Sequence, residues 1–280
     1  MINKFVLRLY STLSPQIRNR IGRSKLLKPI RDIVLRSNGT YKQVKVLVKR
    51  KYLEYETEFA FIASIKVASK AKNRGIENTI LHNSINLIKT YKTKENNAIV
   101  LDVGANFGYL SLVWANSISL QGKVIAFEPN LKVYNSFDNS IKINKLEERI
   151  LLNNLAVGSK NRNVELFSDS TSSNILQSQS KNRRSTTIEM VSLDSFCNRI
   201  GLNQCDLVKI DVDGIELDIL KGADKLIEIC NPIFIVETND DNKLIDFFLK
   251  RNYQILDMKL NPFNLPNTLP QNIFCIPKIN

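Results

Sequence analysis

A turn with two glycines follows a strongly apolar segment, in the order Asp102-Val103-Gly104-Ala105-Asn106-Phe107-Gly108. Glycines in a strand-to-helix turn let the backbone approach a ligand closely and present the amides of the helix N-terminus to it. The dinucleotide fingerprint G-x-G-x-x-G is not met, because Asn106 and Tyr109 occupy positions where it requires glycine. The turn predicts a cofactor site with Asp102, Gly104, Asn106 and Gly108 as candidate residues, and it disfavours NAD.

A second acidic position is Glu128, in the sequence Glu128-Pro129-Asn130 at the end of the next apolar segment. A carboxylate at the end of the second strand can accept hydrogen bonds from both hydroxyls of a ribose. Taken alone, Glu128 also fits a surface acid before a turn proline. Its spacing from the glycine turn favours the nucleoside-binding interpretation.

The third group of polar residues is Lys209-Ile210-Asp211-Val212-Asp213-Gly214-Ile215-Glu216. On a strand, Lys209, Asp211 and Asp213 point to one face, and Glu216 falls in the first turn of the following helix. Asp213 and Glu216 also fit a helix start in which an acid caps free backbone amides. Glu237 ends a further apolar segment, so carboxylates are predicted at four strand ends, which suits a cationic or polyhydroxylated ligand.

The elements that position these residues alternate between short apolar strands and helices. Strands are predicted at 98–103, 123–128, 151–157, 207–212, 233–237 and 272–276, and helices at 109–119, 131–144, 214–229 and 242–252. Buried strands alternating with helices predict a parallel sheet covered on both faces, a three-layer α/β/α arrangement. Such sheets bind ligands at the carboxyl ends of their strands, where the polar residues above fall.

The net charge of +13 is carried by the first third of the chain. Residues 1–97 have a net charge of +15 and residues 98–280 of −2. We divide the chain into a basic amphipathic helical extension (1–40), a β-hairpin and helix leading into the core (41–96), and a ligand-binding domain (97–280). The hairpin is indicated by apolar residues that alternate with charged ones over 44–61. The lone histidine, His82, is expected to be an ordinary helix residue.

As an ordered set, these motifs resemble the FkbM family of S-adenosylmethionine-dependent methyltransferases. The resemblance rests on D-V-G-A-N-F-G, F-E-P, L-A-V-G at 155–158, S-L-D at 192–194 and K-I-D-V-D-G-I-E, and it covers about residues 97–240. One departure is Asp213, where the family usually has Glu, which keeps the charge and shortens its reach.

The resemblance implies a Rossmann-like methyltransferase core of seven strands. It further implies that Asp102, Gly104 and Asn106 hold the methionine part of S-adenosylmethionine and that Glu128 holds the ribose. The adenine would lie near residues 154–156, with Asn154 and Ala156 as candidates. The group methylated in this family is commonly a hydroxyl of a sugar or of a polyketide-derived natural product.

Methyl transfer to a hydroxyl requires collinear acceptor oxygen, methyl carbon and sulfur in a dry site, and a base that takes the hydroxyl proton. The candidate catalytic residues are Asp211, Asp213 and Glu216, of which we favour Asp211 as the base. The same acids could instead hold a divalent cation through oxygen ligands, with Lys209 and Glu237 as further substrate or metal candidates. The sequence does not separate base, metal ligand and helix cap.

Three other functions are less consistent with the motifs. A nucleic-acid methyltransferase is suggested by the basic N-terminus and by Asn231-Pro232-Ile233-Phe234, which lacks the second proline of the amino-methylating motif and begins a strand. A dinucleotide-dependent oxidoreductase or epimerase shares the fold class, and a catalytically inactive binding module would need a damaged glycine turn. We therefore expect a small-molecule or glycan acceptor and not a nucleic acid.

The sequence also gives expectations about location. No segment reads as a signal peptide, and the uncharged run 103–122 is interrupted by glycine, asparagine and serine, which indicates a loop and helix rather than a membrane span. The four cysteines fall in no regular framework and predict reduced thiols. We expect a cytoplasmic protein whose basic extension is a candidate contact for the inner membrane face or a polyanion.

Overall fold

The structure is a computed structural model. It describes residues 40–93, 95–168, 184–212, 214–265 and 268–278, together with scattered residues before position 40 and the pair Ser173–Asn174. Most of the basic extension predicted for residues 1–40 lies outside the described residues, as does Asp213.

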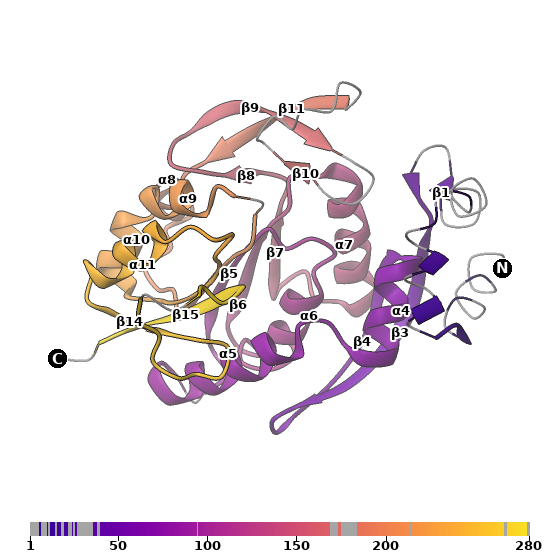
Figure 1. Cartoon of the computed structure of the whole chain (residues 1–280), viewed down its shortest axis with the longest axis horizontal. Coiled ribbons are helices and arrows are strands. Elements are labelled where there is room, and N and C mark those ends of the chain that lie inside the picture. The colour runs from indigo at the N-terminus through magenta and orange to yellow at the C-terminus, as the bar shows by residue number, and fades with distance from the viewer. Residues whose placement is uncertain are drawn as a thin grey trace.

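A central sheet of seven strands organises the molecule, in the order β14-β15-β13-β12-β5-β6-β7 (Figure 1). All neighbouring pairs are parallel except the two that involve β15. The order reverses at β5, so the carboxyl ends of β12, β5 and β6 lie side by side at the switch point where such sheets bind ligands. The strands are β5 (Ile99–Val103), β6 (Lys123–Phe127), β7 (Ile150–Asn153), β12 (Leu207–Ile210), β13 (Ile233–Glu237), β14 (Tyr253–Leu256) and β15 (Asn272–Pro277).

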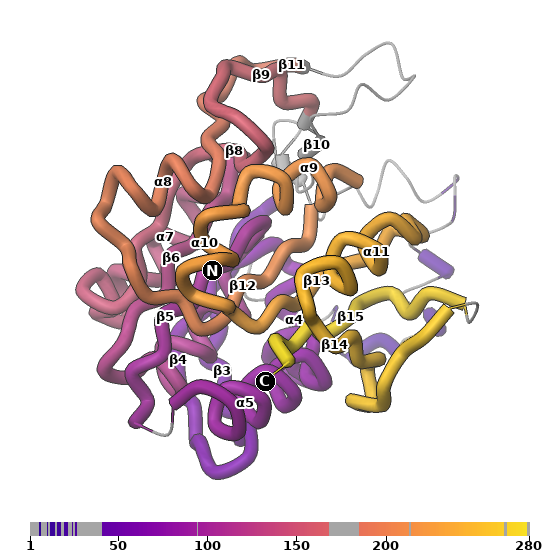
Figure 2. Tube along the Cα trace, turned by 90° about the vertical axis from the view of Figure 1, so that its left-hand side faces the viewer, coloured from indigo at the N-terminus to yellow at the C-terminus, as the bar shows by residue number. Residues whose placement is uncertain are grey.

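Both faces of the sheet are apolar, because alternate residues of each strand enter different hydrophobic clusters. Val100 and Val124 face one cluster, while Leu101 and Ile125 face the other. The first is covered by α5 (Asn78–Tyr91), α6 (Tyr109–Ala115) and α7 (Leu131–Asn144), and the second by α8 (Leu193–Ile200), α9 (Glu216–Lys221), α10 (Asp224–Cys230) and α11 (Lys243–Leu249). Figure 2 shows the side covered by α8, α10 and α11. The predicted three-layer α/β fold with a seven-stranded sheet is confirmed.

A long β-hairpin precedes the sheet and shares its core. Its strands are β3 (Gln43–Tyr52) and β4 (Tyr55–Ser64), which pair antiparallel and lead into α4 (Ile65–Arg74). The apolar hairpin residues Val46, Val48, Phe59 and Phe61 are buried in the same cluster as α5, α6 and α7. The hairpin and α4 therefore extend one helical layer toward the carboxyl ends of the strands.

Helix starts are set by short polar side chains. Asn130 accepts hydrogen bonds from the backbone N–H groups of Lys132 and Val133 at the start of α7. Ser192 accepts one from Ser195 N at the start of α8, and Ser64 plays the same part for α4. The cap at Asn130 fixes the direction in which the chain leaves Glu128.

Two elements differ from the sequence-based expectation. The strand expected at 151–157 is divided, because the chain leaves the main sheet after β7 and Ala156–Val157 (β8) pairs with another sheet. That sheet also contains β9 (Arg162–Ser168), β10 (Ser173–Asn174) and β11 (Arg184–Val191), and it stands at the top of Figure 1. The helix expected at 214–229 is two helices, since Gly222 packs against the backbone of Gly158 and ends α9.

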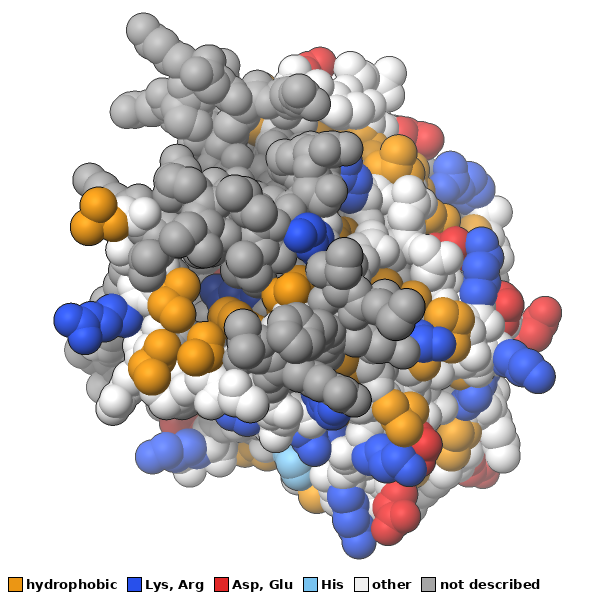
Figure 3. All heavy atoms as spheres, turned by 90° about the vertical axis from the view of Figure 1, so that its right-hand side faces the viewer, with side chains coloured by type: hydrophobic (Ala, Val, Ile, Leu, Met, Phe, Trp, Pro, Cys, Tyr) orange, Lys and Arg blue, Asp and Glu red, His pale blue; other side chains and the backbone are white. Residues whose placement is uncertain are grey.

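Two short strands, β1 (Arg36–Ser37) and β2 (Thr40–Tyr41), form an antiparallel pair before the hairpin. All four cysteines are free thiols, as predicted. None of the described helices has the length and apolarity needed to cross a bilayer. On the face shown in Figure 3, described lysine and arginine side chains are spread over the surface and do not form a single patch.

Candidate active site

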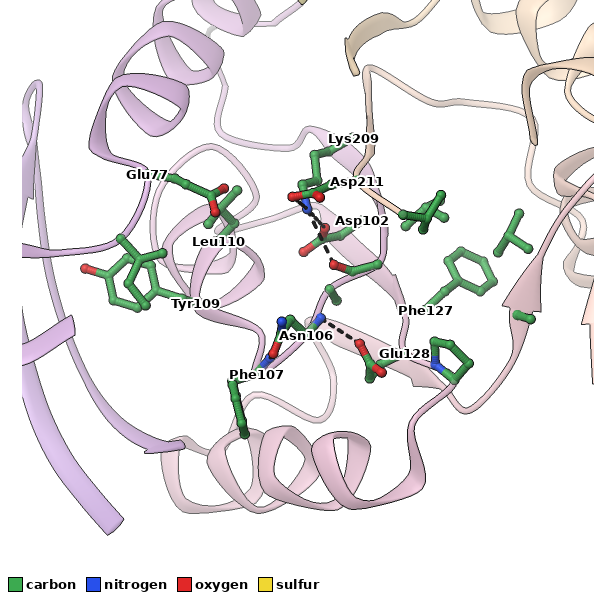
Figure 4. Close-up of a pocket in the computed structure, with 18 of the residues that line it drawn as sticks. Glu77, Asp102, Asn106, Phe107, Tyr109, Leu110, Phe127, Glu128, Lys209 and Asp211 are labelled. Carbon is green, nitrogen blue, oxygen red and sulfur yellow. Dashed lines mark hydrogen bonds and ion pairs between the residues drawn. The ribbon is translucent and has the colours of Figure 1, made fainter. Parts of the chain in front are cut away.

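One cavity of about 330 Å³ opens at the carboxyl ends of β5, β6 and β12. The core domain supplies one end of it, through the glycine turn, Glu128 and residues 155–157. The hairpin, α4 and the segment before α5 supply the other end, with Phe61, Val67 and Glu77 among the lining residues. In Figure 4, Glu77 and Tyr109 lie on one side of Asn106, and Phe127 and Glu128 lie on the other.

Gly104 of the glycine turn packs closely against the backbone that follows β12. Gly104 has a φ of 78°, and a Cβ at this position would lie 2.1 Å from the backbone oxygen of Asp211. Asn106 also has a positive φ of 53°, and its side chain accepts a hydrogen bond from Phe107 N. Only glycine fits at position 104 without moving β12, so the turn and the strand end are fixed against each other.

Gly108 serves packing and does not line the cavity. A Cβ on Gly108 would lie 2.1 Å from the ring of Phe137 in α7. The residue also adopts a φ of 77° immediately before α6 begins. Its requirement for glycine therefore comes from helix contact, and it acts on the site only by setting the position of α6.

Asp102 is fully buried at the end of β5, beside the ammonium group of Lys209. Its Oδ2 accepts a hydrogen bond of 2.5 Å from Ser111, whereas Oδ1 has no hydrogen-bond partner and lies 3.8 Å from Lys209 Nζ. Burial raises the pKa of Asp102 above its usual value, although Lys209 and Ser111 oppose the shift. The cavity wall thus contains a carboxylate oxygen that is buried and unsatisfied.

Lys209 and Asp211 form the tightest ion pair of the site. Lys209 Nζ lies 3.0 Å from Asp211 Oδ2 and donates a hydrogen bond to the backbone oxygen of Gly104. Burial alone would lower the pKa of Lys209, but Asp211 and Asp102 raise it above its usual value. Lys209 in turn holds the pKa of Asp211 below its usual range. Asp211 lines the cavity as predicted, but a carboxylate with a lowered pKa is a weak proton acceptor.

Glu237 lies behind this pair and does not line the cavity. Its carboxyl hydrogen-bonds with Asp211, and its Oε1 accepts a hydrogen bond from Gln271. Burial and the charge of Asp211 raise the pKa of Glu237 to about 7. The two carboxyls therefore share a proton near neutral pH, with Asp211 the more readily ionised partner.

Glu128 is buried at the end of β6 and lines the cavity. Its Oε2 accepts a hydrogen bond from Asn106 N and its Oε1 accepts one from Asn130 N, each 2.8 Å long. Burial raises the pKa of Glu128 to about 7 in spite of these two donors. A carboxylate has about four acceptor positions, so two remain for ligand hydroxyls.

The residues expected around adenine divide between the wall and its support. Ala156 lines the cavity together with Leu155 and Val157. Asn154 does not line it, because its Nδ2 donates hydrogen bonds to the backbone oxygens of Glu128 and Pro129, at 2.9 and 3.0 Å. Asn154 therefore holds the loop after β6 in place.

Glu216 is buried at the start of α9, away from the cavity lining. Its Oε1 accepts hydrogen bonds from Gly214 N and from the side chain of Asn239. Burial raises the pKa of Glu216. Glu216 is the first residue of α9, whose N-cap is Ile215 without a side-chain capping hydrogen bond, so this acid binds an amide that precedes the helix and does not have the place expected for it in a D-x-x-E helix start.

A divalent cation is not supported by the described part of the chain. No group of three or more His, Cys, Asp or Glu side chains there is arranged to hold a metal ion. The described acids already have partners within the protein: Asp211 pairs with Lys209 and hydrogen-bonds with Glu237, and Glu216 accepts from Gly214 N and Asn239. We derive no step through a metal.

Several cavity residues that precede the core domain were not predicted from the sequence. Glu77, Lys70 and Phe61 line the cavity although they precede the glycine turn by 25 residues or more. Neither their types nor their spacing mark them as site residues. Only the way the hairpin folds over the strand ends brings them to the cavity.

The sheet order and the ligand cavity at its switch point define a Rossmann-like methyltransferase fold. The sequence model of the methyltransferase FkbM domain matches residues 102–255, more than half of the chain. The chain therefore belongs to the FkbM methyltransferase family, as its motifs predicted.

Two solved methyltransferase structures are similar to this chain at low sequence identity. Methyltransferase FkbM from Methylobacillus flagellatus KT is 17% identical, with 64% of this chain and 44% of that chain covered and a TM-score of 0.46. The O-methyltransferase from Bacillus cereus in complex with SAH is 12% identical, with 76% of this chain and 87% of that chain covered and a TM-score of 0.44. This chain thus spans 44% of the length of the Methylobacillus protein. Among curated proteins, none matches the sequence significantly.

Proposed function

We propose that this protein is an S-adenosylmethionine-dependent O-methyltransferase that acts on a hydroxyl of a sugar, a glycan or a natural product. The observation that carries the proposal is the combination of family membership with an intact cofactor end of the cavity. Asp102, Gly104, Asn106 and Glu128, which carry the FkbM-like motifs, all line this cavity. The choice of a hydroxyl as acceptor rests on the family resemblance.

The cofactor end fits S-adenosylmethionine in its donor groups. Oδ1 of Asp102 has no hydrogen bond and only a 3.8 Å ion pair with Lys209, so it suits a cationic ammonium, because a buried carboxylate oxygen without a hydrogen bond is costly. The free acceptor positions of Glu128 suit the two ribose hydroxyls. Gly104 also lines the cavity, and its missing Cβ lets the turn pack against the backbone oxygen of Asp211 between these two carboxylates. When bound, this cofactor supplies an electrophilic methyl group.

The chain's own residues would contribute orientation and a dry environment. Lys209, Asp211 and Asn154 connect the glycine turn, the end of β12 and the loop after β6, so hydrogen bonds and an ion pair within the protein hold the cofactor end in place. Apolar side chains such as Phe61, Leu110 and Val157 wall the cavity and exclude water. Holding acceptor and methyl group in line in such a site can supply about 7–11 kcal/mol of the barrier reduction.

Two experiments test this function. Calorimetric titration should show binding of S-adenosylmethionine and S-adenosylhomocysteine, and binding of NAD in their place would refute the proposal. Mass spectrometry of glycans and metabolites from cells with and without the gene should then reveal an acceptor that loses the mass of one CH2 group when the gene is deleted.

The basic N-terminal part is proposed to orient the enzyme toward an anionic surface on the cytoplasmic side, such as the inner membrane face or a polyanionic glycan. The charge of +15 over residues 1–97 supports this proposal, because clustered lysine and arginine bind anionic surfaces in a salt-dependent manner. The full chain with Arg18, Arg20, Arg23 and Lys25 changed to glutamine should bind anionic vesicles more weakly than the wild type. Equal binding would leave these residues as ordinary solvated surface.

A further inference from the structure

Glu77 provides the one carboxylate in the cavity wall that is both accessible and unengaged, among the residues that the structure describes. Its side chain is exposed to the cavity, and no described residue hydrogen-bonds or ion-pairs with it. The other acids of the wall have partners: Asp211 pairs with Lys209, and Glu128 accepts two backbone amides. Asp102 retains a free oxygen, but it is fully buried beneath the glycine turn at the cofactor end.

The backbone at Glu77 is held in an unusual conformation. Glu77 has a φ of 48° and a ψ of 44° immediately before α5, and its side chain makes no capping hydrogen bond. The next residue, Asn78, donates to the backbone oxygen of Arg74 and accepts from the hydroxyl of Tyr52. A non-glycine residue in the left-handed region costs about 1–3 kcal/mol and persists where its surroundings fix it, often at functional sites. These contacts hold Glu77 where its carboxylate reaches the cavity.

Glu77 lies opposite the charged groups of the core. Figure 4 shows its carboxylate on the same side of the cavity as Leu110, pointing toward Asp102, Lys209 and Asp211. Desolvation raises the pKa of Glu77, Asp211 and Asp102 raise it further, and Lys209 and Lys70 oppose these effects. A carboxylate whose pKa is raised toward the working pH is a better proton acceptor than one whose pKa is lowered, as that of Asp211 is.

We propose that Glu77 is the general base of the reaction and that the cavity end built by β4, α4 and the segment before α5 binds the acceptor. The inference rests on the proposed function. The acceptor oxygen forms its bond to the methyl carbon while the bond from that carbon to sulfur breaks, and the bonding electron pair stays on sulfur. The hydroxyl proton passes to a carboxylate oxygen of Glu77, which later releases it to water. Phe61, Val67, Ile76 and Leu110 provide apolar walls for the rest of the acceptor.

The test uses the full chain and a methyl-labelled cofactor. Extracts of small molecules and glycans from cells that lack the gene are incubated with the enzyme and S-adenosylmethionine carrying a trideuterated methyl group, and labelled products are measured by mass spectrometry. Glu77→Gln should lower the initial rate of labelling by about 10²–10⁴-fold, the usual contribution of a general base. Its affinity for S-adenosylhomocysteine should stay within about twofold of the wild type, which also shows that the variant is folded.

The matched control is Glu56→Gln, which makes the same change at an exposed position of β4, outside the cavity lining. This variant should label at the wild-type rate. In the wild type the rate should fall with decreasing pH through the raised pKa of Glu77, and a Glu77→Asp variant should regain part of the activity lost in Glu77→Gln.

The other possible results distinguish a wrong role for Glu77 from a wrong function for the protein. Wild-type labelling by Glu77→Gln would overturn the role of Glu77 and leave the proposed function intact. A loss of S-adenosylhomocysteine affinity in Glu77→Gln would show that Glu77 binds the cofactor, and would also overturn the inference. Failure of the wild type to label any extract, with no cofactor binding by calorimetry, would refute the proposed function itself.

Discussion

The two ends of the cavity are built in different ways. At the cofactor end, backbone groups and buried side chains form a connected network: Gly104 lies against β12, and Glu128 accepts amides from Asn106 and Asn130. At the acceptor end, Glu77 presents a carboxylate that the described part of the chain leaves unpaired, among apolar side chains. The first end is organised by contacts within the protein, whereas at the second the proposed acceptor hydroxyl would supply the hydrogen-bond partner of Glu77.

This difference matches the demands on each end. A common cofactor can be recognised by a fixed arrangement, which lowers the entropic cost of binding. A proton acceptor must keep a free lone pair, so it is not satisfied by the protein itself. Substitutions at the cofactor end should therefore affect affinity and stability together, whereas substitutions at the acceptor end should affect turnover.

The largest effect is expected from Gly104→Ala. The new Cβ would lie 2.1 Å from Asp211 O at a φ of 78°, so the variant should lose roughly 2–5 kcal/mol of unfolding free energy and most of its cofactor affinity. Gly201→Ala is the control, because Gly201 also has a positive φ of 66° but no atom within 4 Å of the added Cβ. Chemical denaturation should show a loss of about 1–2 kcal/mol for Gly201→Ala. Equal losses in the two variants would mean that the close approach at Gly104 has no energetic consequence.

Glu128→Ala should give the next largest effect, on cofactor affinity. It removes the acceptor proposed for the ribose and leaves the amides of Asn106 and Asn130 unpaired, so the affinity for S-adenosylhomocysteine should fall by about 10–100-fold. Because the pKa of Glu128 is about 7, wild-type affinity should weaken as the pH falls from 8 to 6 and the carboxylate is protonated. Calorimetry at several pH values measures both effects, and a Glu128→Ala variant with wild-type affinity would remove Glu128 from the site.

Asp211→Asn should have a smaller effect on binding and a specific effect on Glu237. Loss of the charge weakens the hold on Lys209, which hydrogen-bonds to the backbone of Gly104, so the affinity for S-adenosylhomocysteine should fall by only a few-fold. It also removes the charge that raises the pKa of Glu237, so that pKa should fall from about 7 toward its usual value. An NMR titration of the carboxyl carbons checks this shift. An unchanged titration would show that the two carboxyls are not coupled.

Asn154→Ala should have the smallest effect. It removes two hydrogen bonds to the loop after β6, each worth about 1 kcal/mol, without touching the cavity wall. We expect a modest loss of thermal stability and a decrease of only a few-fold in affinity for S-adenosylhomocysteine. A loss as large as that of Glu128→Ala would mean that Asn154 contacts the cofactor directly.

The sequence was most informative where backbone geometry restricts residue type. The Gly104 turn, the strand-end acids Asp102 and Glu128, and the alternating strands and helices follow from local patterns, and they led to the family and the fold class. Each of these features depends on residues that lie close together in the sequence, which is why the sequence alone reveals it.

The sequence was uninformative where distant segments meet. Glu77 reaches the cavity only because the hairpin and α4 pack over the strand ends, and nothing in its neighbourhood marks it as a site residue. The pKa of Asp211 depends on Lys209, two residues away, and on Glu237 in the neighbouring strand. The sequence does not show how these side chains lie, so it could not indicate that Asp211 has a lowered pKa. The broken strand at 151–157 likewise depends on pairing with β11.

The division of the cavity is tested most directly by titrating S-adenosylhomocysteine into Glu128→Ala and Glu77→Gln side by side with the wild type in a calorimeter. We expect Glu128→Ala to bind S-adenosylhomocysteine about 10–100-fold more weakly than the wild type and Glu77→Gln to bind it with wild-type affinity. Equal weakening of both variants would contradict the division of the cavity, because both carboxylates would then belong to the cofactor and the cavity would have no separate acceptor end.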